Sequence, residues 1–311
     1  MAKTKLALGT AQLGMHYGVA NQSGKPDCEA AFRILNLACR HNVKIWDTSP
    51  VYGDSEEIIG KFLKTSLQKP KISSKLPSLS GNGSGKLTRS TLSELVGKAV
   101  LQSLASLGTD VIDYYLIHDE RDFRAFGLEL LDVLHGFKVK GLLDNIGISV
   151  YSPDIATTAL QSKKFDALQL PYNLFDRRFS HIISQAFSLG VTVFTRSVFL
   201  QGLFFLSSSN VREFLPEATV AVKKLNFLSE KYERSIAEIA LCYVRDTPGI
   251  DAVLIGVETP EQLIENLSLF SAPTLSKELR AEIDESFANL PTCVVNPSTW
   301  KRTVRDEKTP I

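Results

Sequence analysis

Short apolar segments of strand length alternate along the chain with longer segments whose apolar residues recur at helical spacing. Each predicted strand is followed by a predicted helix. The predicted strands are Leu6–Thr10, Val43–Asp47, Lys71–Lys75, Ile112–His118, Asn145–Ser149, Ala167–Leu170, Val191–Thr195 and Ala252–Ile255. The predicted helices are Glu29–Arg40, Ser55–Lys64, Ser90–Leu107, Phe123–Lys140, Asp154–Gln161, Ser180–Leu189, Ser235–Asp246 and Pro260–Leu269. A further amphipathic stretch, Ser276–Asn289, comes after the last of these helices.

This alternation predicts an α/β fold with a parallel sheet. Eight strand–helix units must bury both faces of the sheet, and they do so by closing into a (β/α)8 TIM barrel. We predict one domain over residues 1–311, because no linker or low-complexity segment divides the chain. A doubly wound nucleotide-binding sheet is the alternative, but no predicted strand is followed by G-x-G-x-x-G. The glycine-rich segment Gly81–Gly85 contains serine and asparagine, which favours a mobile surface connection over a phosphate cradle.

Composition and charge narrow the possible functions. Hydrophobic residues make up 44% of the chain and charged residues 22%, as in ordinary globular proteins. The 35 Lys and Arg nearly balance the 34 Asp and Glu, so neither nucleic acid nor a membrane is an expected partner. With no signal-type segment and no run of 18 apolar residues, we expect a cytoplasmic protein acting on a small molecule. Four widely spaced cysteines without ligand-like neighbours predict free thiols and no metal site: Cys28, Cys39, Cys242 and Cys293.

Titratable residues stand at or just after the ends of three consecutive predicted strands. Asp47 ends the second strand and Tyr52 follows five residues later. Lys75 ends the third strand and His118 the fourth. The carboxyl ends of barrel strands face the active site, and consecutive strands are neighbours. We therefore expect these four side chains to converge.

Their chemistry is complementary. A phenol has an unperturbed pKa near ~10, and an adjacent ammonium group favours the phenolate. Lys75 would supply that ammonium group, and Asp47 would keep it charged and oriented. A neutral His118 would donate a hydrogen bond to a carbonyl oxygen. Each residue alone has a structural explanation, such as a turn cap or a loop aromatic, but their joint occurrence favours a site that protonates an oxyanion.

In these motifs the sequence resembles the aldo-keto reductase family, and the likeness runs from Gly9-Thr10-Ala11 to Asn266. The segments DTSPVYG at 47–53, SK at 74–75 and LIH at 116–118 are similar to the family's Asp, Tyr, Lys and His tetrad. The resemblance implies an oxidoreductase that transfers a hydride between NAD(P) and a small aldehyde, ketone or alcohol, sugars included. It also implies that Tyr52 is the general acid in reduction and that His118 orients the carbonyl group.

The resemblance also assigns residues to the cofactor. Ser149 and Gln169 are similar to the groups that hold the nicotinamide carboxamide. Val150 departs from the family pattern, which often has Asn there, and Asn173 could take the place of that Asn. Arg196 stands where many relatives have an aromatic residue that stacks on the nicotinamide, and whether it stacks or pairs with an anion is open. The cofactor residues implied are Gly9, Thr10, Ala11, Ser149, Gln169, Arg196, Ser197, Gly202, Gly256, Glu258, Gln262 and Asn266.

The segment from Ile255 to Asn266 is similar to the family's adenosine-end motif, where basic residues often bind the 2′-phosphate of NADP. Here Gly256, Val257, Glu258 and Gln262 carry no positive charge. A carboxylate beside a ribose favours hydroxyl groups over a phosphate, so we expect NAD or dual use rather than strict NADP. The alternative explanation is that Glu258 only caps the following helix.

The resemblance further implies that the C-terminal helix and tail lie over the barrel mouth and help to select the substrate. Trp300 is a candidate pocket wall, with a packing role as the equal alternative. Tyr17 is a comparable candidate near the start of the chain. Substrate, direction of reaction and oligomeric state are not determined by the sequence.

Two other functions stay open. A barrel lysine at a strand end can form a Schiff base, so Lys75 could serve a lyase. However, Asp47 would keep this lysine protonated, whereas a Schiff-base lysine requires a lowered pKa. The second alternative is a non-catalytic regulatory subunit that binds the nicotinamide cofactor without turnover.

Overall fold

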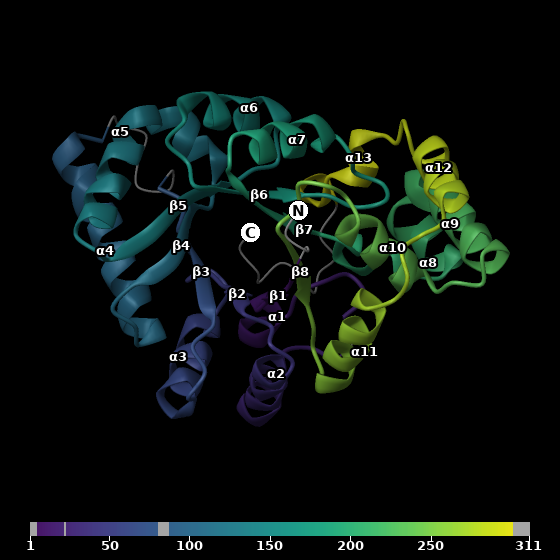
Figure 1. Ribbon diagram of the computed structural model, residues 1–311, viewed down its shortest axis with the longest axis horizontal. Helices are drawn as coiled ribbons and strands as arrows, with labels where there is room; N and C mark the ends of the chain where they lie inside the picture. The colour runs from purple at the N-terminus through teal and green to yellow at the C-terminus, as the bar shows by residue number, and fades with distance from the viewer. Residues whose placement is uncertain (1–4, 22, 80–86, 301–311) are drawn as a thin grey trace.

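The computed structural model describes residues 5–21, 23–79 and 87–300. Eight parallel strands close into one barrel in chain order, with β1 paired to both β2 and β8 (Figure 1). The strands are β1 (Lys5–Gly9), β2 (Ile45–Asp47), β3 (Lys71–Leu76), β4 (Ile112–Ile117), β5 (Leu143–Ser149), β6 (Ala167–Pro171), β7 (Thr192–Arg196) and β8 (Ala252–Gly256). The predicted (β/α)8 barrel is confirmed, and each predicted strand matches an observed one within two residues at either end.

Helices surround the barrel and link successive strands (Figure 1). Those that follow the predicted pattern are α2 (Cys28–Arg40), α3 (Ser55–Thr65), α4 (Arg89–Leu107), α5 (Glu120–Val139), α6 (Pro153–Ser162), α7 (Ser180–Ser188), α10 (Ile236–Arg245), α11 (Pro260–Phe270) and α12 (Lys277–Ser286). The Gly81–Gly85 segment lies outside the described residues. Among the described residues, no helix is both long and apolar enough to cross a membrane.

Several elements were not predicted from the sequence. They are α1 (Ala11–Gly14), η1 (Leu200–Phe205), α8 (Ser208–Phe214), η2 (Pro216–Ala218), α9 (Thr219–Lys231), α13 (Thr292–Val295) and η3 (Pro297–Thr299). Four of these elements, η1, α8, η2 and α9, lie between β7 and β8, where one connecting helix was predicted. In α9 the buried residues Ala221, Val222, Leu225 and Leu228 do recur at helical spacing. That pattern was present in the sequence but was not needed to connect the strands.

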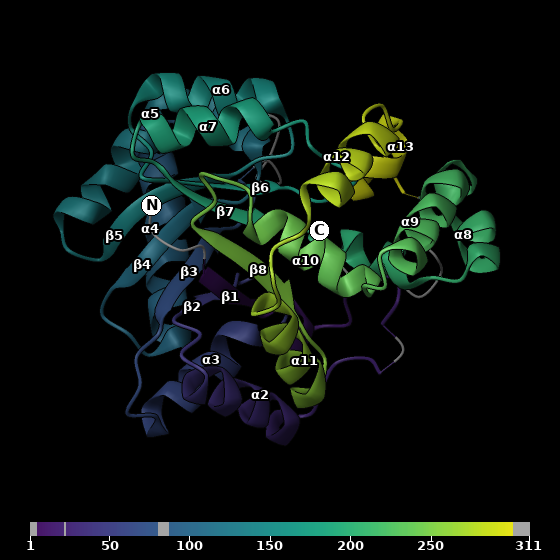
Figure 2. The same cartoon turned by 45° about the vertical axis from the view of Figure 1, so that its right-hand side comes forward.

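The C-terminal elements form a layer with the inserted helices. Figure 2 shows α12 and α13 on the same side of the molecule as α8 and α9. Glu282 on α12 ties the layer together, because its carboxylate accepts from Lys224 at 3.0 Å and from Lys231 at 2.6 Å on α9. Residues 301–311, the end of the predicted tail, lie outside the described residues.

The barrel interior is filled by side chains below the carboxyl ends of the strands. They form a cluster of Ala7, Ile45, Leu116, Ala167, Phe194, Ala252 and Leu254. Gly147 makes room for one of them, because a Cβ atom there would lie 2.3 Å from Leu116 Cδ2. These packed apolar side chains fill the barrel below the carboxyl ends of the strands. The polar residues therefore lie together at the carboxyl ends.

Candidate active site

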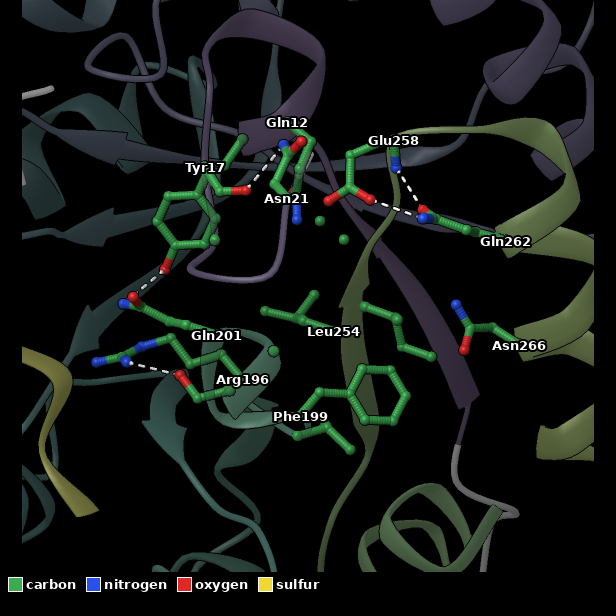
Figure 3. A pocket seen from close by; sticks show the side chains of 18 of the residues that line it. Gln12, Tyr17, Asn21, Arg196, Phe199, Gln201, Leu254, Glu258, Gln262 and Asn266 are labelled. Carbon is green, nitrogen blue, oxygen red and sulfur yellow. Dashed lines mark hydrogen bonds between the residues drawn. The ribbon is translucent and has the colours of Figure 1, made fainter. Parts of the chain in front are cut away.

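A cavity of about 480 Å³ opens where β1, β7 and β8 end, and Figure 3 shows the side chains that point into it. Its floor includes Leu254 from the barrel interior. Tyr17, Asp47 and Tyr52 line it together with every predicted cofactor residue except Ser149. Those cofactor residues are Gly9, Thr10, Ala11, Gln169, Arg196, Ser197, Gly202, Gly256, Glu258, Gln262 and Asn266.

A buried ion pair lies beneath the cavity. Lys75 Nζ donates to Asp47 Oδ2 at 2.6 Å and to the Thr48 carbonyl oxygen at 2.9 Å. Lys75 is completely buried and does not line the cavity, whereas Asp47 does. Asp47 is the last residue of β2 and Lys75 the last but one of β3, and these strands are parallel neighbours, which is why residues 28 positions apart meet. Burial lowers the pKa of Lys75, although the negative charge of Asp47 opposes the shift.

The second carboxylate oxygen of Asp47 is also fixed. Asp47 Oδ1 accepts from Ser73 Oγ at 2.8 Å and from Gln169 Nε2 at 2.8 Å. Gln169 stands on β6, so one carboxylate links three strands of the barrel. An isolated carboxylate would be unfavourable at this depth, and these donors together with Lys75 compensate for its lost hydration.

Tyr52 packs between this ion pair and His118. Lys75 Nζ lies 4.7 Å from the centre of the Tyr52 ring. The Tyr52 and His118 rings meet edge to face, with centres 5.8 Å apart and planes at 87°. Among the described residues, none accepts a hydrogen bond from the Tyr52 hydroxyl, which leaves it available to a group in the cavity. The structure thus brings the four predicted side chains into one cluster, of which Asp47 and Tyr52 line the cavity and Lys75 and His118 lie behind them.

The protonation of this cluster differs from the expectation in one respect. Burial raises the pKa of Tyr52 well above its usual value, and the charge of Asp47 raises it further. A lowered pKa, expected from the nearby ammonium group, is therefore wrong for the protein without a bound ligand. The phenol keeps its proton, which is the form that an acid requires.

His118 is neutral at physiological pH. Burial first, and then the positive charges of Lys75 and Arg196, lower its pKa to about 3. Ser49 Oγ lies 3.5 Å from His118 Nδ1. A neutral imidazole can still donate one hydrogen bond, as the sequence led us to expect.

The first turns after β1 hold the loop that carries Tyr52. Ser55 Oγ lies 2.7 Å from Thr10 Oγ1 and 2.9 Å from Thr48 Oγ1. Gly53 adopts φ +58°, and a Cβ atom there would lie 2.2 Å from the Gly14 carbonyl oxygen. The contact between these two backbones leaves no space for a side chain, so the Tyr52 loop can adopt this path only with glycine.

The loop after β7 has an unusual backbone. Ser197, Leu200, Gln201 and Gly202 all adopt positive φ, at 62°, 49°, 55° and 91°. The loop is held by the segment after β1, because Val19 N donates to the Gln201 carbonyl oxygen at 2.9 Å. Turns in which a right-handed residue adjoins a left-handed one, as Phe199 and Leu200 do here, can aim backbone N–H groups at an anion. This chemistry fits the pyrophosphate of a dinucleotide.

The far end of the cavity carries a fixed carboxylate. Gln262 Nε2 donates to Glu258 Oε2 at 2.7 Å, and Gln262 Oε1 accepts from Glu258 N at 2.7 Å. The residue that caps α11 is Thr259, whose side chain accepts from Gln262 N. Capping is therefore done by Thr259, and the carboxylate of Glu258 stays at the cavity wall, bonded to Gln262 (Figure 3).

Three candidate residues have other surroundings. Ser149 is buried at the end of β5 and does not line the cavity. Asn173, the candidate substitute for the family's Asn at position 150, is fully buried and donates to the Ser197 carbonyl oxygen at 2.9 Å, which supports the β7 loop. Trp300 packs edge to face on Phe214 at 5.5 Å and does not line the cavity, so its packing role is the one observed.

Three polar residues of the cavity wall were not predicted from the sequence. Gln12, Asn21 and Gln201 all point into it (Figure 3). Gln12 follows Gly9-Thr10-Ala11 directly, and a Cβ atom on Gly256 would lie 2.2 Å from its Oε1. The position of Gln12 beside that motif was a usable signal. For Asn21, no strand end or motif marks the position.

Comparisons with known proteins agree on one family. A family model described as the Aldo/keto reductase family matches residues 5–288. The aldo-keto reductase YhdN of Bacillus subtilis is 25% identical and covers 98% of this chain and 96% of its own. The NADH-specific methylglyoxal reductase of Escherichia coli is also 25% identical, covering 85% of this chain and 89% of its own.

Solved structures show the same fold. An aldo-keto reductase from Bacillus halodurans, in its holo form, superposes with a TM-score of 0.73 at 22% identity and covers 96% of each chain. A glycerol dehydrogenase from Gluconobacter oxydans gives a TM-score of 0.71 at 22% identity, covering 97% of this chain and 95% of that chain. At this identity the likeness establishes the shared barrel and leaves the substrate undefined.

Proposed function

Because the chain belongs to the aldo/keto reductase family, whose members carry out NAD(P)-dependent carbonyl reduction, we propose that Tyr52 is the acid that protonates the substrate oxygen. The observation that carries this proposal is the position of Tyr52. Its side chain lines the cavity, and its ring lies over the amine of the buried Lys75–Asp47 pair. A protonated phenol at that place can deliver its proton into the cavity.

The neighbouring residues prepare Tyr52 for this step. Bound nicotinamide would supply the hydride, and residues from the β1, β7 and β8 ends would hold the cofactor in the cavity. Tyr52 gives its proton to the carbonyl oxygen as the alcohol forms. Lys75 then stabilises the phenolate that remains, since a cation next to the ring favours the charged form. His118, being neutral, donates a hydrogen bond that orients the carbonyl group.

Replacing Tyr52 by phenylalanine tests the proposal. Tyr52→Phe should lower the rate of carbonyl reduction by about 10² to 10⁴-fold, because a positioned acid typically contributes that much. Binding of NADH, followed by fluorescence, should stay within about threefold, since the hydroxyl is needed for chemistry and not for docking. Tyr232→Phe is the matched control, as this hydroxyl bonds Glu282 on the outer helices. Full turnover in Tyr52→Phe would remove Tyr52 from the mechanism.

We further propose that NADH is preferred over NADPH. Gln262 fixes the Glu258 carboxylate at the cavity wall, and a fixed negative charge there repels a 2′-phosphate. Replacing Glu258 by glutamine should lower the KM for NADPH by about tenfold and leave the KM for NADH within about threefold, as expected for one partly screened charge. Glu261→Gln, in the first turn of the following helix α11, is the control. A wild-type preference for NADPH would contradict this assignment.

The Schiff-base alternative is disfavoured by the position of Lys75. The lysine is fully buried and donates to Asp47 and Thr48, and Asp47 and Tyr52 occupy the cavity wall in its place. A substrate carbonyl in the cavity therefore meets Tyr52 before it meets the amine. Covalent trapping of substrate on Lys75 by borohydride would overturn this argument. The regulatory alternative predicts cofactor binding without turnover, which the assay of the wild-type protein distinguishes.

A further inference from the structure

Arg196 places a positive charge at the reactive end of the cavity. It is the last residue of β7 and it lines the cavity wall. Its guanidinium group stacks over the Tyr151 ring, with 4.0 Å between the guanidinium carbon and the ring centre. Nη2 donates to the Val150 carbonyl oxygen at 3.2 Å. Nη1 donates to Ser197 Oγ at 3.5 Å. Stacking on one face and these two hydrogen bonds fix the orientation of the group, and the guanidinium still has further N–H donors.

The part of the chain that the structure describes holds no carboxylate that neutralises this charge. Among the described residues, none forms an ion pair with Arg196. The nearby Asp47 already accepts from Lys75, Ser73 and Gln169. A partly buried arginine without a counter-charge is unfavourable unless a ligand supplies one. The unpaired charge therefore indicates an anionic ligand.

The charge acts on the catalytic cluster rather than on the adenosine end. The guanidinium of Arg196 opposes the burial that raises the pKa of Tyr52, and it helps to lower the pKa of His118. The geometry agrees, because Arg196 shares the cavity wall with Tyr52 and bonds the carbonyl oxygen of Val150, just beyond the end of β5, which is the neighbour of the strand that leads to His118. An anion held there belongs to the molecule that reacts beside Tyr52.

Two further polar groups lie beside Arg196. Gln201 Nε2 donates to the Tyr17 hydroxyl oxygen at 3.3 Å. Figure 3 shows Arg196, Gln201 and Tyr17 together at one side of the cavity, with Glu258, Gln262 and Asn266 at the other. The side with Arg196 thus combines one cation with a phenol and an amide, which suit a ligand that carries hydroxyl groups as well as charge.

We propose that Arg196, with Tyr17 and Gln201, forms a subsite for a carboxylate of the substrate. The carbonyl compound reduced beside Tyr52 then carries a carboxylate and hydroxyl groups, as a uronic acid does, and is not a neutral aldehyde. A planar guanidinium matches a carboxylate in shape, and a single fixed arginine suits a monoanion better than a phosphate dianion. This inference rests on the proposed reductase function, whose substrate class it names.

Pairs of substrates that differ only in the carboxylate test it. D-Glucuronate is compared with D-glucose, and succinic semialdehyde with butanal, in NADH-dependent reduction. Wild-type kcat/KM should favour the acid of at least one pair. Arg196→Met keeps the apolar contact with Tyr151, and it should lower kcat/KM for the acid by about 10- to 100-fold, mostly through KM, as expected for the removal of charge-assisted hydrogen bonds. Turnover of the neutral partner is the reference within each pair, and its kcat/KM should fall by a clearly smaller factor because it has no carboxylate for Arg196 to bind.

Further measurements distinguish a role of Arg196 in binding the substrate carboxylate from a role in binding a phosphate or the cofactor. Arg212→Met removes an exposed arginine on α8 and should change neither substrate of a pair. Glucose 6-phosphate tests a phosphate in place of the carboxylate, and preference for it over glucuronate would overturn the proposal. A fall in NADH affinity in Arg196→Met, with equal losses for acid and neutral substrates, would assign Arg196 to the cofactor and also overturn it.

A binding measurement keeps this inference separate from the proposed reaction. The NADH complex is titrated with D-gluconate and with D-glucitol, which differ in the carboxylate and are not reduced. Gluconate should bind to the wild-type complex and at least tenfold more weakly to Arg196→Met, as the loss of a charged partner predicts. If gluconate binds in this way but no carbonyl is reduced, the reductase proposal fails and the subsite stands. If carbonyls are reduced but gluconate does not bind, the subsite fails alone.

Discussion

Replacing Asp47 by asparagine removes the only carboxylate bonded to Lys75 among the described residues, with almost no change in shape. The asparagine oxygen can still accept from Lys75, so the main loss is the negative charge. Leaving a buried charge without its partner typically costs about 3 to 5 kcal/mol. Lys75 is fully buried and cannot turn its amine into water, which places the substitution within that range.

This loss in the free energy of unfolding corresponds to a lower melting temperature. Unfolding entropy is about 2.1 cal/mol/K per residue, which for 311 residues gives about 0.65 kcal/mol/K. Asp47→Asn should therefore lower Tm by about 5 to 8 °C, measured by calorimetry at pH 7. The double variant Asp47→Asn with Lys75→Met has no unpaired charge, so it should be more stable than Asp47→Asn alone.

The pH dependence of the same variant provides a second check. Without Asp47, burial lowers the pKa of Lys75 further below its unfolded value near ~10.4. The unfolded state then binds more protons than the folded state, so the stability of Asp47→Asn should rise with pH between the two pKa values. A Tm within 1 °C of wild type, or a double variant less stable than Asp47→Asn, would refute the reasoning.

Two other predictions concern single residues. The pKa of His118 is about 3 in the folded protein and near 6.5 when unfolded, so stability should fall as pH drops from 6.5 towards 3, by at most about 1.4 kcal/mol per unit. His118→Gln should show a shallower loss in urea titrations across that window, and an identical slope would contradict the assignment. Gly53→Ala should cost at least about 2 kcal/mol, because its Cβ atom meets the Gly14 carbonyl oxygen in addition to the strain of positive φ. Gly141→Ala, at φ +73° just after α5 with open space around it, is the control and should cost about 1 kcal/mol.

Much of the fold could be predicted because the signal is local. Apolar runs such as Ala167–Leu170 and the amphipathic stretches between them follow from the periods of strand and helix, and eight pairs leave few closed arrangements. Of the helices between β7 and β8, α10 was predicted, whereas α8 and α9 were missed, although α9 carries the helical pattern. Nothing in the barrel requires a second connecting helix, so the connection rule gave no reason to look for one.

The candidate site was partly predictable for the same reason. Asp47, Lys75 and His118 stand at or next to strand ends, and parallel neighbouring strands bring such residues to one edge. Gln201 and Asn21 could not be found in this way, because they lie in loops whose path depends on contacts with each other. Val19 N bonding to the Gln201 carbonyl oxygen is such a contact, and no local pattern encodes it.

The sequence by itself determined the order of strands and helices, the family resemblance and the set of titratable groups at the strand ends. Only the tertiary structure decided how those groups are charged. The pKa of Tyr52 is raised rather than lowered because burial outweighs the nearby cation, and burial depends on every element packed around the residue. The surroundings of Arg196 were decided in the same way, because the Tyr151 ring comes from the loop after β5 and the neutralised Asp47 from β2. Charge balance in a cavity is a property of the packed barrel, whereas strand and helix periods are properties of short segments.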